Sequence, residues 1–301
     1  MAHRIDRRGF LKAGGAAGAA VSLGLLGGPT AWAAEAKEAA PSTARLGWQL
    51  SCAQYTFRRF TLFETLDMLD ELGIRLVEPA FFLRLDKARP KLQVNESLSP
   101  ELRKEVKARL ADKGIRMASF YSNLGADQAA AKKIFDFAAE MGVQVIVAEP
   151  PPPAFGMIDK LCNEYKISLG IHNHPKKANY SFWDPANVAA ACKDHSPRIG
   201  ACCDTGHWVR SGLDPLECLK KMQGRITSFH LKDVLEWDKP AARDVILGTG
   251  KANYPAVLGE LKRQGFKGIL AIEYEHDTSE LNKDVAQCAA FVEKACKDLA
   301  G

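Results

Sequence analysis

The sequence predicts an α/β fold, a (β/α)8 barrel, from three observations. Short apolar segments rich in β-branched residues alternate with amphipathic helical segments along the chain. Eight such units fill about 260 residues, a typical length for a barrel of this kind. Segments such as "ELGIRLVE", "AEMGVQVIVAE" and "KRQGFKGILAIE" share one pattern, in which the end of a helix is followed by a glycine, a buried strand and a polar residue at the strand end. A doubly wound sheet ranks second, because no G-x-G-x-x-G follows a strand.

The expected elements follow one another without an internal linker. Strands are expected at Leu46–Cys52, Leu76–Glu78, Arg116–Phe120, Val145–Glu149, Ser168–Ile171, Ile199–Cys203, Ile226–His230 and Ile269–Glu273. Helices are expected between them, among others at Phe63–Leu72, Pro100–Lys113, Ala129–Met141 and Pro255–Gln264. Each of these four helices ends at or just before a glycine, the residue that most readily adopts a left-handed C-cap. We therefore expect one catalytic domain over residues 45–301.

The composition is that of an ordinary globular protein. The 301 residues are 47% hydrophobic and 26% charged, with 41 Lys and Arg against 36 Asp and Glu, a net charge of +5. These values exclude a disordered chain, collagen and a coiled coil. Eight cysteines are too sparse in a chain of this length for a disulfide scaffold.

The first 34 residues have the pattern of an export signal. Charged residues precede an apolar stretch rich in Gly and Ala, which ends at Ala31-Trp32-Ala33. Arg7-Arg8 followed by x-Phe-Leu-Lys resembles a twin-arginine signal. We expect a signal peptide at residues 1–34 and a short linker at residues 35–44. The protein would then pass through the twin-arginine translocon, folded, to the periplasm or the outside of a bacterial cell.

Two kinds of partner are not expected. Without residues 1–34 the chain carries 37 basic and 35 acidic residues, a net charge of +2, which is too small for a nucleic-acid-binding footprint. The apolar stretch of the signal is shorter than the roughly 18 residues that a membrane span needs, so no stable membrane insertion is expected. The sequence leaves open whether the protein forms a homo-oligomer.

Polar residues collect where the expected strands end. They are Tyr55, Glu78, Tyr121, Glu149, His172, His174, Asp204, His207, His230, Lys232, Glu273 and Glu275. In a barrel these ends form one rim, and the active site lies there. Imidazoles and carboxylates that converge on one rim suit a divalent metal such as Mn, Zn, Co, Fe or Mg.

Three of these segments carry a family resemblance. The motifs "CCDTGHWVRSG", "RITSFHLKDV" and "GFKGILAIEYE" resemble the sugar phosphate isomerase/epimerase family, the xylose isomerase-like TIM barrels, over roughly residues 45–295. The resemblance implies one divalent metal bound by Glu, Asp, His and Glu from strands five to eight. Asp204, His230 and Glu273 match the last three of these ligands.

The fifth strand departs from the family pattern. His172 stands where many relatives carry the glutamate, and Glu149 on the neighbouring strand end is expected to supply the missing carboxylate. We therefore expect the metal at Glu149, Asp204, His230 and Glu273, with His172 as a fifth ligand or a base. Epimerases of the family are thought to use a pair of glutamates, so a histidine here leaves dehydration open.

The resemblance implies a metal-dependent sugar isomerase or epimerase that works through an enediolate. A metal acidifies the carbon between a carbonyl and a hydroxyl, and a base removes its proton. The expected catalytic residues are Glu149, His172, His207 and Glu273. The expected substrate contacts are Tyr55, His174, His207 and Lys232. Export argues for a sugar without phosphate, because sugar phosphates are mainly cytoplasmic.

Three alternatives remain at this point. The first is a lyase or dehydratase of the same family, acting on keto-sugars or 3-keto-glycosides. Below it ranks a phosphodiesterase like endonuclease IV, which needs about three metals and histidines on the first strands, where this chain has none. A non-catalytic sugar-binding barrel also ranks below it, since Asp204, His230 and Glu273 are all present.

Overall fold

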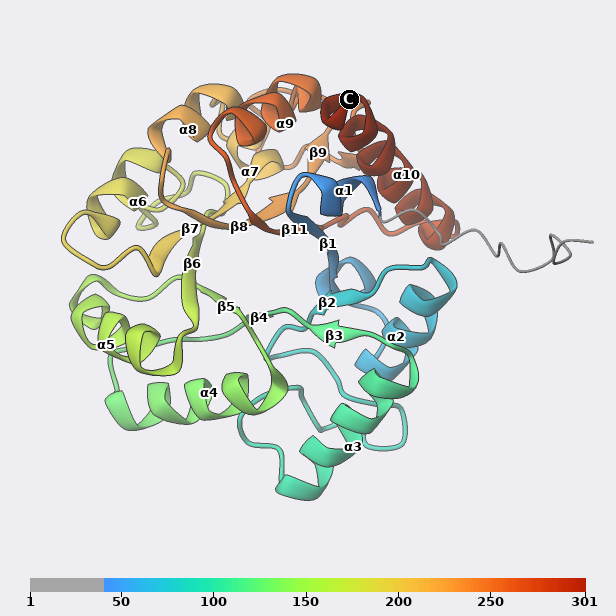
Figure 1. The fold of residues 1–301 in the computed structure, drawn as a ribbon, viewed down its shortest axis with the longest axis vertical. Helices are drawn as coiled ribbons and strands as arrows, with labels where there is room; N and C mark the ends of the chain where they lie inside the picture. The colour runs from blue at the N-terminus through green and yellow to red at the C-terminus, as the bar shows by residue number, and fades with distance from the viewer. Residues whose placement is uncertain (1–40) are drawn as a thin grey trace, which may run out of the picture. The chain divides into compact units, whose positions relative to one another are not determined.

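The computed structural model describes residues 41–301, so the expected export signal at residues 1–34 lies outside the described residues. Nine strands form one sheet that curls around a central axis (Figure 1), in the order β3-β2-β1-β11-β8-β7-β6-β5-β4. The strands are β1 (Trp48–Ala53), β2 (Leu76–Glu78), β3 (Arg116–Met117), β4 (Ser119–Tyr121), β5 (Val145–Ala148), β6 (Ser168–His172), β7 (Ile199–Asp204), β8 (Ile226–Leu231) and β11 (Gly268–Ile272).

The sheet has eight positions because two of its strands are parts of one segment. β3 and β4 flank Ala118, and all printed pairings within this sheet are parallel. A parallel bridge between Ala80 and Tyr121 joins the segment after β2 to β4 and brings the two ends of the sheet together. The expected (β/α)8 barrel is confirmed.

Most of the helices surround the barrel on its outside, whereas α1 (Ser42–Arg45) and α7 (Thr205–Arg210) lie inside their ring in the view of Figure 1. The others are α2 (Leu62–Glu71), α3 (Pro100–Asp112), α4 (Gln128–Met141), α5 (Phe155–Tyr165), α6 (Pro185–Cys192), α8 (Pro215–Lys221), α9 (Tyr254–Arg263) and α10 (Leu281–Ala300). Short 3-10 turns lie at Gln54–Phe57 (η1) and Pro152–Ala154 (η2). Within residues 41–301, no helix has both the length and the apolar character needed to cross a bilayer.

Local sequence signals explain where these helices begin and end. Thr61 caps α2 and forms a capping box with Glu64, which satisfies backbone N–H groups of the first turn. Asp127 caps the start of α4 by accepting from the backbone N–H of Ala130. Gly142 ends the same helix in the left-handed conformation at φ 79°, which L-residues with a Cβ adopt less easily.

Helix α1 overlaps the end of the segment, residues 35–44, for which the sequence suggested a linker. The backbone N–H of Ser42 donates to Glu293 Oε2 of α10 at 2.8 Å, and the Thr43 hydroxyl donates to Oε1 of the same carboxylate at 3.1 Å. The chain is therefore fixed to the barrel from the first residues of α1 onward.

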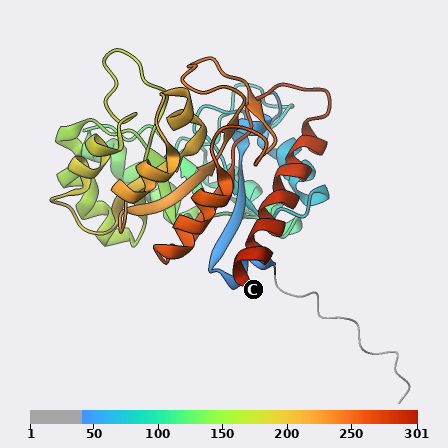
Figure 2. The same ribbon diagram turned by 90° about the horizontal axis from the view of Figure 1, so that it is seen from above.

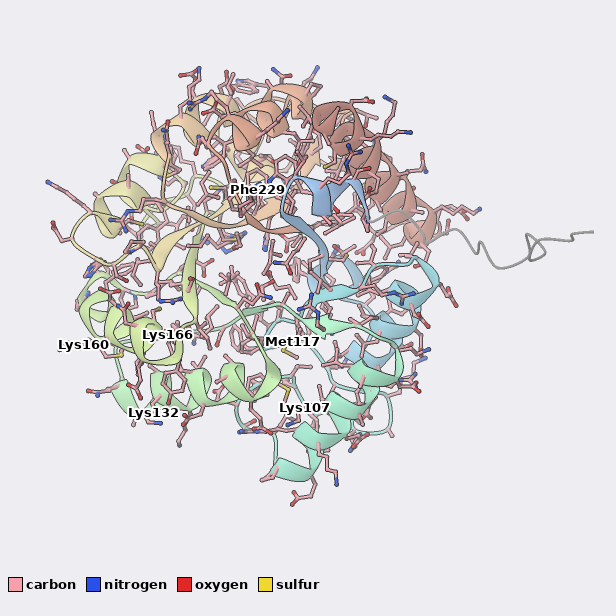
Figure 3. All side chains as sticks on the ribbon, viewed as in Figure 1. Lys107, Met117, Lys132, Lys160, Lys166 and Phe229 are labelled. Carbon is pink, nitrogen blue, oxygen red and sulfur yellow. The ribbon has the colours of Figure 1, made fainter. Side chains whose placement is uncertain are left out.

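The apolar core has two parts. The larger part lies between the strands and the surrounding helices; Met117 and Phe229 lie inside the ring of helices, whereas Lys132 and Lys160 lie at its outer edge (Figure 3). The smaller part fills the barrel interior and consists of Leu76, Ala118, Val145, Val147, Cys202 and Ile269. This interior cluster forms the floor beneath the carboxyl ends of the strands.

The two ends of the barrel differ. In Figure 2, strand β1 rises from the end near the C-terminus of α10 toward the opposite end, where the longest loops stand. One of these loops follows β8 and contains a small antiparallel pair, β9 (Asp233–Val234) and β10 (Asp244–Val245). The Asp233 carboxylate accepts backbone N–H bonds from Gly248, Gly250 and Ala252 at 2.9–3.0 Å, which fixes the segment before α9.

Candidate metal centre

Five polar residues converge where the barrel strands end. His172 and Asp204 are the last residues of β6 and β7, and Glu78 is the last residue of β2. His230 is the penultimate residue of β8, and Glu273 directly follows β11. All five residues are at most 7% exposed, so the strands hold them inside the rim and not on the surface.

Four of these residues, His172, Asp204, His230 and Glu273, form what we call the central cluster. His172 Nε2 lies 3.7 Å from Asp204 Oδ2. His230 Nδ1 lies 3.9 Å from the same oxygen and 3.0 Å from Glu273 Oε2. His207 adjoins the cluster from α7, with Nε2 3.8 Å from Asp204 Oδ2. Donor atoms of His172, Asp204, His207 and Glu273 all lie within 4.8 Å of one another.

The central cluster has donor atoms at separations that suit a divalent cation. Two ligands that each stand about 2.1 Å from one ion are at most about 4.2 Å apart, and the three contacts given above, out of the six pairs of donor atoms, fall below this limit. His172 Nε2 and Asp204 Oδ2 are buried without a hydrogen-bond partner. Buried polar atoms normally have partners, so two unpaired atoms that face one another indicate a site for a ligand between them.

Each histidine of the central cluster has its other ring nitrogen against a carboxylate. His172 Nδ1 lies 3.2 Å from Glu149 Oε1. His230 Nε2 lies 2.7 Å from Glu78 Oε1. An imidazole that donates one N–H to a carboxylate presents the lone pair of its other nitrogen, which is the form that binds a metal.

Glu149 belongs to a second group of polar side chains beside the cluster. Its carboxylate accepts from the Tyr121 hydroxyl at 2.9 and 3.0 Å. His174 Nε2 lies 3.2 Å from Glu149 Oε1 and 3.3 Å from the Tyr121 hydroxyl. Glu149, His172 and His174 also offer donor atoms within 4.8 Å of one another, but hydrogen bonds within the group account for these contacts.

Lys232 brings a buried positive charge to the carboxylates. Its Nζ lies 2.8 Å from Glu273 Oε2, 2.6 Å from Glu275 Oε1 and 3.2 Å from His207 Nε2. It also lies 3.1 Å from Asp204 Oδ2, at an angle that leaves this oxygen without a hydrogen bond. The side chain is fully buried, so its charge is neutralised by these acids and not by water.

These neighbours set the charge of the central cluster. Burial disfavours the ionised form of Glu273, but Lys232 and His230 hold the pKa of this carboxyl well below its usual value. Burial also opposes protonation of His172, yet contacts with Asp204 and Glu149 raise its pKa to about 10. Burial keeps the pKa of His207 well below the usual value. A cation that binds His172 must therefore replace a proton.

A cavity of about 600 Å³ opens above the central cluster, a volume typical of small-molecule sites. Its lining residues are Ala53, Tyr55, Glu78, Ala80, Phe82, Tyr121, His172, His174, Pro175, His207, Arg210, Pro240, Ala241, Glu273 and Glu275. Of the residues that the sequence suggested for substrate or catalysis, Tyr55, His172, His174, His207 and Glu273 reach this cavity. Among the described residues, Glu149 and Lys232 contact lining side chains without lining the cavity themselves.

Sequence reasoning left several cavity residues unassigned. Arg210 is buried, donates to Asp244 Oδ1 at 2.5 Å and lies 3.1 Å from His207 Nδ1. It follows His207 by three residues on α7, and this helical spacing is the one signal that could have suggested the pair. Phe82, which packs 6.0 Å from the Tyr55 ring centre and stays 39% exposed, lies in a loop that carried no motif.

Curated relatives match parts of the chain. The rhizopine catabolism protein MocC of Rhizobium meliloti is 32% identical over 131 residues, which are 39% of this chain and 39% of that protein. An inosose dehydratase of Clostridium botulinum is 34% identical over 93 residues, 26% of this chain and 31% of that protein. The chain therefore matches less than half the length of each of these relatives.

Solved structures match nearly the whole barrel. An uncharacterised protein from Parabacteroides distasonis is 32% identical, with a TM-score of 0.66, and the match covers 82% of this chain and 99% of that one. A xylose isomerase-like TIM barrel protein from Mycobacterium smegmatis, in complex with magnesium, shares the fold at 16% identity and a TM-score of 0.68, over 85% of this chain and 99% of that one. A structure of the IOLI protein contains zinc, at 17% identity and a TM-score of 0.61, over 84% and 99% of the two chains.

Family profiles match both parts of the sequence. The twin-arginine translocation signal profile matches residues 4–24, which confirms the expected signal for export. The profile of the xylose isomerase-like TIM barrels matches residues 66–295, which contain the whole central cluster. The chain belongs to the xylose isomerase-like TIM barrel family.

Proposed function

We propose that the protein is a divalent-metal-dependent isomerase or epimerase of a sugar or sugar derivative without phosphate. The observation that carries this proposal is the central cluster, in which His172 Nε2, Asp204 Oδ2, His230 Nδ1 and Glu273 Oε2 face one another beneath a cavity of about 600 Å³. Zinc and magnesium in proteins of the same fold agree with a cation at such a cluster.

The geometry refines the ligand set that the sequence suggested. We assign the cation to His172, Asp204, His230 and Glu273, and we give Glu149 a place behind His172, because its carboxylate faces Nδ1 and not the cluster. Nitrogen and oxygen donors in this ratio suit Mn, Zn, Co, Fe or Mg. A bound cation would polarise a substrate carbonyl and stabilise negative charge on the oxygens next to it.

The surrounding residues have separate roles in this proposal. Glu273 reaches both the cluster and the cavity, so it is placed to hold or move a proton at a substrate carbon. His207 lines the cavity as a neutral imidazole that can bind a substrate hydroxyl. The Lys232 ammonium stabilises the ionised carboxylates of Asp204 and Glu273.

The rim of the cavity has the character of a sugar-binding surface. Tyr55 and Phe82 pack edge to face, and Phe82 lies 6.3 Å from the Tyr121 ring centre in the same arrangement. Aromatic faces bind the C–H faces of sugars, and His174, which is 35% exposed, adds a polar contact on the other side. The twin-arginine signal supports action in the periplasm or outside the cell.

A dehydratase acting on a keto-sugar or a cyclic polyol ketone is the second candidate. Two observations favour it: the partial matches to inosose dehydratases, and the different groups that line different parts of the cavity. The lining carboxylates Glu78 and Glu273 come from the ends of β2 and β11, whereas the imidazoles of His172 and His174 come from the end of β6, further round the barrel. An epimerase that returns a proton to either face gains from two similar bases, while elimination needs only one base and one acid.

One experiment separates these functions. The metal-loaded protein is incubated in D₂O with unphosphorylated ketoses, inososes and 3-keto-glycosides, and the products are followed by NMR. Deuterium at the carbon next to the carbonyl, with an isomerised or epimerised product, supports the first proposal. An unsaturated product that has lost water or an alcohol supports the dehydratase or lyase, and the absence of exchange with every ketone contradicts both.

A further inference from the structure

Glu78 contacts His230, a residue that does not lie on a strand next to its own. It ends β2, whereas His230 lies on β8, and β1 and β11 stand between these strands. The Glu78 carboxylate therefore reaches across the barrel interior to place Oε1 2.7 Å from His230 Nε2. Both side chains are at most 2% exposed, so water cannot substitute for either partner.

This contact fixes which nitrogen of His230 faces the central cluster. With Nε2 held at Glu78, Nδ1 is left 3.0 Å from Glu273 Oε2 and 3.9 Å from Asp204 Oδ2. Glu149 and His172 repeat the arrangement with the ring reversed, because there Nδ1 faces the carboxylate and Nε2 faces the cluster. Two histidines on separate strands thus each have an outer carboxylate and an inner nitrogen.

We propose that Glu78 is a positioning residue that holds His230 with Nδ1 toward the bound cation. The inference rests on the proposed metal centre and adds a residue to it that neither the motifs nor the cluster distances assign. A carboxylate behind a histidine ligand fixes the ring, fixes the N–H and makes the inner nitrogen a stronger donor. Glu78 is therefore expected to raise the affinity of the site without touching the cation.

A purely structural ion pair is the competing explanation, and one atom argues against it. Glu78 Oε2 is buried and has no hydrogen-bond partner, although the carboxylate lines the cavity. An unpaired buried acceptor costs about 1–3 kcal/mol, a cost that packing alone does not offset. A place in the cavity wall with Oε1 on His230 instead suits a carboxylate that orients a ligand of the bound cation.

The test compares Glu78→Ala, Glu78→Gln and the control Glu275→Gln in the full-length mature protein. Glu275→Gln removes one carboxylate charge from the same rim, but Glu275 contacts Lys232 and no histidine of the central cluster. The dissociation constant of Zn²⁺ is measured by competition with a chromophoric chelator, and the melting temperature of each metal-free protein is recorded. Glu78→Gln keeps the size of the side chain and serves if the alanine variant does not fold.

The proposal predicts an order of affinities. Glu78→Ala should bind Zn²⁺ about 10–100-fold more weakly than the wild type, the usual cost of losing an outer carboxylate. Glu78→Gln should lie between them, because its amide oxygen still accepts from Nε2–H but carries no charge. Glu275→Gln should lose clearly less affinity than Glu78→Ala.

Two results would overturn the inference in distinguishable ways. If the wild type binds Zn²⁺ and Glu78→Gln binds it equally well, with only the melting temperature of the metal-free variants lowered, Glu78 is structural and the metal centre stands. If the wild type itself fails to bind Zn²⁺, Mn²⁺ or Mg²⁺, the metal centre fails, and the role of Glu78 fails with it.

Discussion

Two layers of the barrel interior carry opposite chemistry on the same strands. The lower layer is apolar and includes Val147, Cys202 and Ile269. The upper layer lies two residues further along β5 and β7 and four residues further along β11, at or just past the strand ends, and contains Glu149, Asp204 and Glu273. Because every second residue of a strand points the same way, an apolar floor and a charged site can be built on one set of strands.

Apolar and charged side chains in these two layers affect the stability of the protein in different ways. Apolar side chains of the lower layer stabilise the barrel by leaving water. Asp204 and Glu273 of the upper layer are also buried, and burying a charge costs free energy unless it has a partner. Lys232, which is fully buried among Asp204, Glu273 and Glu275, shows how closely these charges are balanced. Mutations in the two layers should therefore have different effects on stability and on metal binding.

The largest effect is expected in the upper layer at Glu273. Glu273→Gln should abolish turnover and weaken metal binding by more than the roughly 10–100-fold expected for an outer contact, because it removes a proposed ligand. Metal content by elemental analysis and deuterium exchange into the substrate measure the two effects. Retention of both by a folded variant would show that the central cluster is not the active centre.

Lys232→Met should destabilise the protein by about 3–5 kcal/mol in the presence of a chelator, because three carboxylates then lose their buried counter-charge. A divalent cation should restore part of this loss by supplying positive charge at Asp204 and Glu273. Urea unfolding with and without Zn²⁺ measures both values. Equal stability of variant and wild type in chelator would contradict the charge balance described for the upper layer.

The sequences of these strands predict part of the fold and part of the candidate site. The order of strands and helices and the placement of Asp204, His230 and Glu273 at strand ends follow from periodicity and from the motifs around them. The contact between Glu78 and His230 could not be foreseen, because it depends on side chains reaching across the closed barrel. Arg210 and Phe82 were missed for a related reason, since loop conformation and not strand order brings them to the cavity.

Gly170, on the lower part of β6, has a smaller expected effect. A Cβ at this position would lie 2.9 Å from Cys202 Cβ and 2.9 Å from Ser228 Oγ, so the interior has no room for it. Gly170→Ala should lower the free energy of unfolding by about 1–3 kcal/mol through overpacking. Denaturant unfolding checks this value, and an unchanged midpoint would show that the floor of the barrel is less tightly packed than described.

The smallest effect is expected for Ile269→Val in the lower layer. Loss of one buried methylene should cost about 0.5–1.5 kcal/mol of stability and leave the affinity for Zn²⁺ unchanged. Unfolding and chelator competition on the same sample measure the two quantities. A change in affinity comparable to that of Glu78→Ala would mean that the two layers are not independent.

The location of a bound cation tests the proposed metal centre most directly. Crystals of the mature protein soaked in Mn²⁺ or Zn²⁺ would be measured at the absorption edge of the metal, so that anomalous scattering marks its position. We predict one strong peak at about 2.0–2.3 Å from His172 Nε2, Asp204 Oδ2, His230 Nδ1 and Glu273 Oε2. A peak bound by Glu149 and His174 instead, or no peak within the barrel, would contradict it.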